Sequence, residues 1–177
     1  MTDLRYPIGP RPALPAEART PETLATWAVA LQKSVAEWQT LAATCTPEDL
    51  ARTYRPESWT VSQLIHHVPE AHLFGLVRLK LGLSQENYVI QPMDEQKLMA
   101  QPDKKLPVAA AVAQLAALNE VWVALLLGVD LTEWSREILH PEEGKQDLWQ
   151  LAAKHEWHLR RHLAHARLAT MQQVDVI

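Results

Sequence analysis

Four long segments of the chain repeat apolar side chains at the three- and four-residue spacing of an amphipathic helix. No segment alternates apolar and polar residues over the length of a strand, so the pattern predicts an all-α protein. Helix-start signals agree, since Thr20 precedes a proline and Thr60 is followed three residues later by Gln63. The simplest assembly is a four-helix bundle with helices at about 21–44, 61–83, 108–127 and 148–171.

The first 19 residues differ from the rest because prolines cluster there, at positions 7, 10, 12 and 15. Each proline removes a backbone donor and biases the preceding residue away from the helical conformation. We therefore expect residues 1–19 to form an extended or irregular arm that packs on a helical domain of residues 20–177. The connections between the helices can cross a 20-residue helix, about 30 Å, which allows but does not require an up-down-down-up order.

Charge and composition exclude several classes of protein. The 17 Lys and Arg residues against 21 Asp and Glu, with no long basic run, make nucleic acid an unexpected partner. Cys45 is the single cysteine, which rules out an internal disulfide. The chain start lacks a signal-peptide pattern, and the longest uninterrupted apolar run, Val121–Val129, is far shorter than the roughly 20 residues of a membrane span. We predict a soluble, cytoplasmic protein with no membrane partner.

The eight histidines are the most informative side chains of the sequence. Spacings of three, four and three place four of them on one face of the last helix, where they continue an apolar stripe: His155, His158, His162 and His165. A buried neutral imidazole needs a partner for its donor and for its acceptor, and a metal ion would satisfy several at once. Histidines four apart, such as His158 and His162, bring two ring nitrogens to one point without bending the helix.

The helix at 61–83 supplies a third candidate ligand. His67 lies on its inward stripe, whereas His66 is rotated toward a flank. We predict that His67, His158 and His162 bind a divalent metal and leave an open coordination position, with zinc as the default and nickel, cobalt, copper or manganese as alternatives. The alternative is a set of hydrogen-bonded core histidines. We expect His155 and His165 beside the site, and the others at the surface or in local turns: His66, His72 and His140.

Two residues close to His67 bear on its chemistry. Glu70, three residues later, is the best-placed carboxylate for a catalytic base, and its alternative is a solvated surface charge. Pro69 removes one backbone hydrogen bond of the helix and should kink it, end it early or cause a harmless bend.

Seven short motifs are spread along nearly the whole chain: Tyr6-Pro7-Ile8-Gly9, Tyr54-Arg55, Trp59-Thr60-Val61, His66-His67, Asp94-Glu95, His140-Pro141 and Trp157-His158. In these motifs the chain resembles the DinB/YfiT superfamily, and its YfiT branch of metal-dependent hydrolases in particular. The resemblance covers nearly the whole length and implies an up-down-down-up bundle, a homodimer, a cytoplasmic location and a metal bound by His67, His158 and His162. It departs from the family at Arg160 and Arg161, which replace a histidine-rich run and either attract an anionic substrate or form a solvated face.

Three functions stay open. The first is a metal-dependent hydrolase that acts on a small molecule. The second is a transferase that activates a low-molecular-weight thiol, such as bacillithiol or mycothiol, at the metal, with Cys45 serving only in packing. The third is a non-catalytic bundle whose metal is closed by His165 as fourth ligand. Trp59 and Trp157 are candidates for the wall of a pocket.

Overall fold

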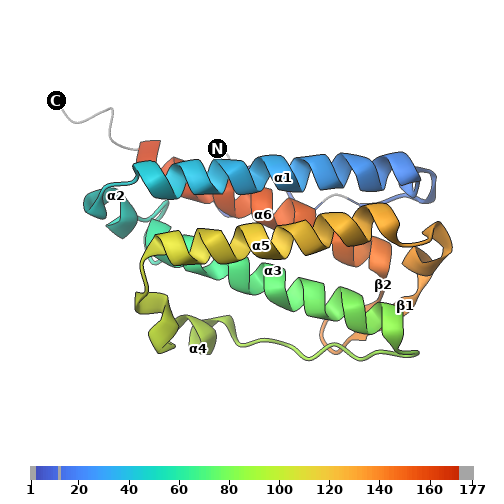
Figure 1. The fold of residues 1–177 in the computed structure, drawn as a ribbon. Helices are drawn as coiled ribbons and strands as arrows, with labels where there is room; N and C mark the ends of the chain where they lie inside the picture. Colours follow the sequence, from blue (N-terminus) through green and yellow to red (C-terminus); the bar gives the residue numbers. More distant parts are fainter. Residues whose placement is uncertain (1–2, 12, 172–177) are drawn as a thin grey trace.

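The computed structural model describes residues 3–11 and 13–171, and it is a helical bundle (Figure 1). Pro12 of the predicted arm and residues 172–177 of the predicted domain lie outside the described residues. The four predicted helices are confirmed, and their caps form as expected, because Thr20 accepts from the Thr23 N–H and Thr60 pairs reciprocally with Gln63. The bounds are α1 Pro21–Thr44, α3 Val61–Ser84, α5 Val108–Gly128 and α6 Leu148–Met171.

The helices follow the up-down-down-up order. In Figure 1, α1 and α6 run in one direction and α3 and α5 in the other. Each of α1 and α3 packs against both α5 and α6. The parallel helices α3 and α5 are joined by a crossover that contains α4 (Glu95–Met99) and a 3-10 turn at Pro102–Lys105. The antiparallel neighbours α3 and α6 carry the predicted metal ligands.

Two short strands contradict the expectation that the chain contains no strand. They are β1 (Glu137–His140) and β2 (Gly144–Asp147), which pair as an antiparallel hairpin just before α6. Gly144 has a φ of +83°, a conformation that favours glycine at the turn. Four residues are too few for a period-two pattern to stand out from the surrounding sequence, which is why the alternation could not be seen. A further short helix, α2 (Pro47–Ala51), lies between α1 and α3.

Pro69 does not end α3, which excludes the early break among the three effects expected of this proline. The helix continues from Val61 to Ser84 through the proline. Residues on either side are packed in the core, and Ile65 and Val68 are almost fully buried. This packing offsets the one hydrogen bond that proline removes, since tertiary contacts supply most helical stability in proteins.

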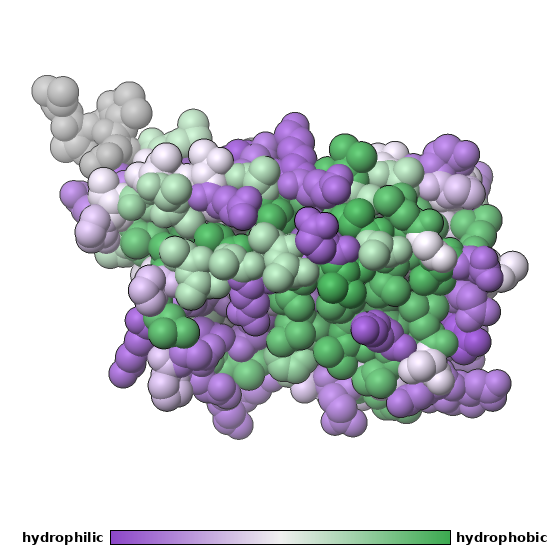
Figure 2. Space-filling model, viewed as in Figure 1, coloured by the Kyte–Doolittle hydropathy of each residue, from purple (hydrophilic) through white to green (hydrophobic). Residues whose placement is uncertain are grey.

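Helix α5 is long and apolar enough, by length and composition alone, to cross a membrane. The uninterrupted apolar run was therefore too narrow a criterion. In the structure one face of α5, including Leu115 and Trp122, is buried in the bundle core. The opposite face is exposed and includes Val121 and Leu127. Figure 2 shows the resulting apolar area over α1 and α5.

The N-terminal arm lies against α6. The Arg161 Nε atom donates to the Arg5 carbonyl at 3.0 Å. The Trp157 indole N–H donates to the Gly9 carbonyl at 3.3 Å. These contacts bring the backbone of the arm next to the histidine face of α6.

Candidate metal centre

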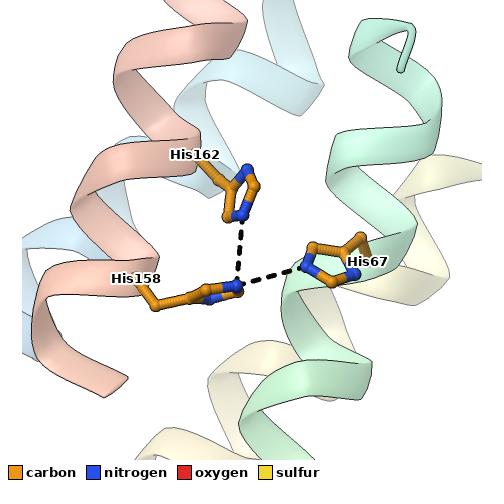
Figure 3. Close-up of side chains that lie close together, drawn as sticks. All are labelled: His67, His158 and His162. Atoms are coloured by element: carbon orange, nitrogen blue, oxygen red, sulfur yellow. Dashed lines mark hydrogen bonds between the residues drawn. The ribbon is translucent and has the colours of Figure 1, made fainter. Parts of the chain in front are cut away.

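The three predicted ligands meet where α3 and α6 pack together. His67 comes from α3, His158 and His162 come from α6, and their rings point toward one another (Figure 3). The Nε2 atom of His158 lies 3.2 Å from that of His67 and 3.1 Å from that of His162. One nitrogen from each ring lies within 4.8 Å of the other two. The structure therefore brings the predicted trio to one point.

The spacing of these nitrogens suits a tetrahedral metal ion. Imidazole nitrogens bind zinc at about 2.0–2.1 Å, so two of them at tetrahedral corners lie about 3.3 Å apart. Hydrogen bonds suit the cluster less well. The Nε2 atom of His158 faces a nitrogen of His67 and one of His162, and in one tautomer it cannot donate to one and accept from the other. A cation accepts all three lone pairs.

His165 determines which nitrogen of His162 carries a proton. The His165 Nε2 atom lies 3.3 Å from the Arg5 carbonyl oxygen, which can only accept, so this nitrogen is protonated. The Nδ1 atom of neutral His165 then accepts from the Nδ1–H of His162, 3.4 Å away. The Nε2 atom of His162 consequently directs a lone pair into the cluster. His165 is thus an orienting partner beside the site, as the sequence predicts, and the arm completes the chain of hydrogen bonds.

Burial keeps the three candidate ligands neutral. It lowers the pKa of His67 to about 4, with the charges of Lys104 and Arg161 adding to the effect. It also lowers the pKa of His158 and of His162 well below the usual value for histidine. Protons therefore do not compete for these nitrogens at neutral pH, and a metal can bind without displacing them.

Aromatic rings enclose one side of the cluster. The Trp59 ring lies 4.5 Å from that of His67, which places it at the site as one of the expected wall residues. Tyr54 stacks on His165 at 4.0 Å. The Trp157 indole N–H instead donates to the Gly9 carbonyl of the arm. The Arg161 guanidinium lies over the Trp157 ring, 5.0 Å from its centroid.

The three histidines expected at the surface or in local turns are all buried, so the surface alternative was wrong for each of them. His66 faces the crossover and His72 stacks on Trp122 of α5, because α3 is covered on several sides by other elements. His140 does sit in a local turn, where its Nδ1 atom accepts the backbone N–H groups of Glu142 and Glu143, but it is also buried. Sequence periodicity describes one face of a helix and does not show how many neighbours cover it.

The carboxylate predicted as a base lies in an ion pair. The Glu70 Oε1 atom accepts from the Lys104 Nζ atom at 2.7 Å, and both side chains are largely buried. A cavity of about 170 Å³ adjoins the cluster instead at His158, and Glu95 and Arg78 line it. Burial raises the pKa of Glu95.

Sequence reasoning assigned no role to these two cavity residues. Glu95 stands in a motif of the resemblance, although its position in the sequence gives no sign that it reaches the histidines. Arg78 did leave a signal, because it lies three residues after Gly75 on the inward stripe of α3.

Comparisons with known proteins agree with this architecture. The chain is 35% identical over 169 residues to proteins named "Putative metal-dependent hydrolase" from Bacillus cereus (strain 03BB102) and Bacillus thuringiensis subsp. konkukian (strain 97-27). The match covers 93% of this chain and 94% of each relative.

Two solved structures share the fold. YfiT from Bacillus subtilis, described as "a probable metal-dependent hydrolase with an unusual four-helix bundle topology", has a TM-score of 0.86 at 28% identity, covering 97% of this chain and 98% of YfiT. The mycothiol-dependent maleylpyruvate isomerase has a TM-score of 0.61 at 16% identity, covering 82% of this chain and 60% of the isomerase. Residues 30–166 match the DinB superfamily. The chain belongs to this superfamily.

Proposed function

We propose that this protein is a metal-dependent hydrolase whose divalent metal is held by His67, His158 and His162. The convergence of three neutral imidazoles, two of them buried and that of His158 half-buried, is the observation that supports the proposal most strongly. The names of the relatives point to the same class of reaction.

Three neutral ligands suit catalysis better than a purely structural role. A divalent ion held in this way keeps its full charge and an open position, from which it can polarise a carbonyl group and lower the pKa of water. The hydrogen bonds from the Arg5 carbonyl through His165 to His162, called the His165 relay below, orient the His162 ring so that its Nε2 lone pair points into the cluster. Trp59 excludes water from one side of the cluster.

Two carboxylates compete for the role of general base. Glu70 is the candidate that sequence spacing favours, but its oxygen accepts from Lys104. Glu95 lines the cavity next to His158, and no cation in the described ranges forms an ion pair with it. Partial desolvation raises the pKa of Glu95 above the usual glutamate value, although the side chain keeps contact with solvent. We favour Glu95 and keep Glu70 as the alternative.

Zinc is the metal that we propose by default, since imidazole ligands also suit nickel, cobalt and copper, and manganese is a further alternative. The proposed substrate is a small molecule, as the small cavity requires. A cytoplasmic location and the absence of nucleic-acid and membrane partners stay predictions from the sequence.

A thiol transferase is the second candidate. The fold is shared with a mycothiol-dependent isomerase, and the open cavity beside His158 would admit a thiol. Burial raises the pKa of Cys45, which keeps that side chain protonated, so the reacting thiol would come from a small molecule. The closed, non-catalytic site is less well supported, because both nitrogens of His165 already face His162 and the Arg5 carbonyl.

A homodimer remains part of the proposal. Large apolar side chains are exposed on neighbouring faces of α1 and α5, with Val29 64% and Leu127 62% exposed (Figure 2). A second copy of the chain would cover them. Light scattering should give a molar mass of twice that of the monomer for the wild type. The Leu127→Glu variant should have the mass of the monomer.

The proposed function is tested with zinc-loaded protein and a panel of small esters and amides, with and without an added low-molecular-weight thiol. Hydrolysis without thiol that is lost in His67→Ala supports the hydrolase. Consumption of an electrophile such as a haloarene only when the thiol is present supports the transferase. Equal turnover by the wild type and His67→Ala would contradict both.

A further inference from the structure

The small cavity beside the histidine cluster is lined by charged side chains as well as by His158. Its volume of about 170 Å³ is the space of about six water molecules in the liquid. Its walls include His158 of the cluster, Arg78 of α3, Glu95 of α4 and Lys154 of α6. A ligand in this space touches both a metal ligand and several charged groups.

Arg78 is buried without an acidic partner. The residue is 8% exposed, and its Nη2 atom donates to the Gln91 carbonyl at 3.0 Å. No carboxylate of the described residues lies within ion-pair distance of its guanidinium. Burial lowers the pKa of Arg78, but a guanidinium stays charged at neutral pH. A buried charge of this kind is costly unless something pairs with it.

The nearby acid Glu143 is already occupied. It forms an ion pair with Lys154, and its other oxygen accepts from the Gln146 amide at 3.0 Å. Arg11 adds a weaker contact at 3.4 Å. The positive charge of Lys154 is therefore compensated, whereas that of Arg78 is not.

Arg160 and Arg161, which the sequence offers as possible attractors of an anionic substrate, already have partners within the protein. Arg160 pairs with Glu156. Arg161 donates to the Arg5 carbonyl and lies over the Trp157 ring. Neither lines this cavity.

We propose that Arg78 binds the carboxylate of a small organic acid in this cavity, with the rest of the acid extending toward His158. The planar guanidinium fork matches a carboxylate with two parallel hydrogen bonds. Glu95, Glu142 and Glu143 line the same cavity, and their charges oppose a phosphate dianion more strongly than a carboxylate with a single charge. The acid is then the substrate of the three-histidine centre, so this inference rests on the proposed function.

The test uses metal-free, isotope-labelled full-length protein titrated with acetate, acetamide and inorganic phosphate, with arginine Nε–H resonances as the readout. Acetate should shift the Arg78 resonance in a saturable way, and the neutral amide should not. Arg78→Gln should weaken acetate binding by about tenfold or more, because the charge and the fork are both lost. Arg78→Lys should weaken it less. Arg167→Gln, an exposed arginine of α6 paired with Glu37, is the matched control and should bind acetate normally.

Acetate binding by Arg78→Gln at wild-type strength overturns the proposal, as does tighter binding of phosphate than of acetate. If Arg78→Gln does not fold by circular dichroism, Arg78→Lys decides, and unchanged acetate affinity in that variant overturns the proposal. Zinc analysis separates the two levels of inference. Arg78-dependent acetate binding without zinc binding leaves Arg78 as a carboxylate-binding residue but removes the proposed function and the role of the acid as its substrate. Zinc binding without acetate binding overturns the inference and leaves the proposed function.

Discussion

Two groups of histidines lie between α3 and its neighbours, and both are buried, yet only one resembles a metal site. In the cluster of His67, His158 and His162, the Nε2 atom of His158 lies at hydrogen-bonding distance from that of His67 and that of His162. In the inner pair of His72 and His155, both rings pack on Trp122 and each Nε2 atom lacks a partner among the described residues. Burial on a helical stripe is thus common to both groups. Convergence of the nitrogens and a hydrogen bond from His162 to His165 outside the cluster distinguish the proposed metal site.

The largest expected effect concerns catalysis at the convergent cluster. Glu95→Gln should lower kcat by about 10²–10⁴-fold on the ester or amide that the zinc-loaded protein hydrolyses, since a general base contributes this much. Zinc content should not change. Glu70→Gln is the matched control, because Glu70 lies in an ion pair with Lys104. A larger loss in Glu70→Gln than in Glu95→Gln would assign the base to Glu70.

The inner pair should matter for stability instead. A side chain added at Gly75 would overlap the His155 ring far inside van der Waals contact. Gly75→Ala should therefore reduce the free energy of unfolding by about 3 kcal/mol, the upper part of the range for overpacking. Urea denaturation with and without zinc measures the change. A stable variant with normal melting would show that the ring moves aside easily.

The sequence predicted the helices and the three histidines of the cluster, but not the burial of His72 or the position of Glu95. Helix bounds and the pairing of His158 with His162 follow from local periodicity and capping, which neighbouring residues determine. The burial of His72 and the position of Glu95 beside His158 depend on how α5 and the crossover pack on α3, over separations that periodicity does not describe. The β-hairpin was missed because each of its strands has four residues.

Acid should destabilise the folded protein through the inner pair of His72 and His155. Burial lowers the pKa of His72 to about 4, from the ordinary histidine value of 6.5. Below pH 6.5 the unfolded chain binds a proton at His72 that the folded chain excludes, so stability falls as the pH drops from about 6.5 to 4 and is constant above that window. The contribution is on the order of 3 kcal/mol. Denaturation of metal-free protein across this range should show a shallower slope for His72→Gln, and an unchanged slope would assign the titration to other groups.

The smallest effect is expected on zinc affinity when the hydrogen bond between His162 and His165 is removed. His165→Phe keeps a ring against Tyr54 but cannot accept from the Nδ1–H of His162. Zinc affinity should fall by about 10–100-fold, as is typical when a partner of a metal-bound histidine is lost. Competition with a chelator gives the affinity, and thermal melting of the metal-free protein separates a relay defect from a packing defect. Unchanged affinity would remove His165 from the site.

Cobalt titration of the metal-free protein, followed by visible absorption, tests the central distinction most directly. The wild type and His72→Gln should each bind one cobalt ion with the same spectrum, whereas His67→Ala and His158→Ala should lose the spectrum and most of the affinity. A cobalt spectrum that survives both alanine substitutions, or that disappears in His72→Gln while the protein remains folded, would contradict a metal site formed by His67, His158 and His162.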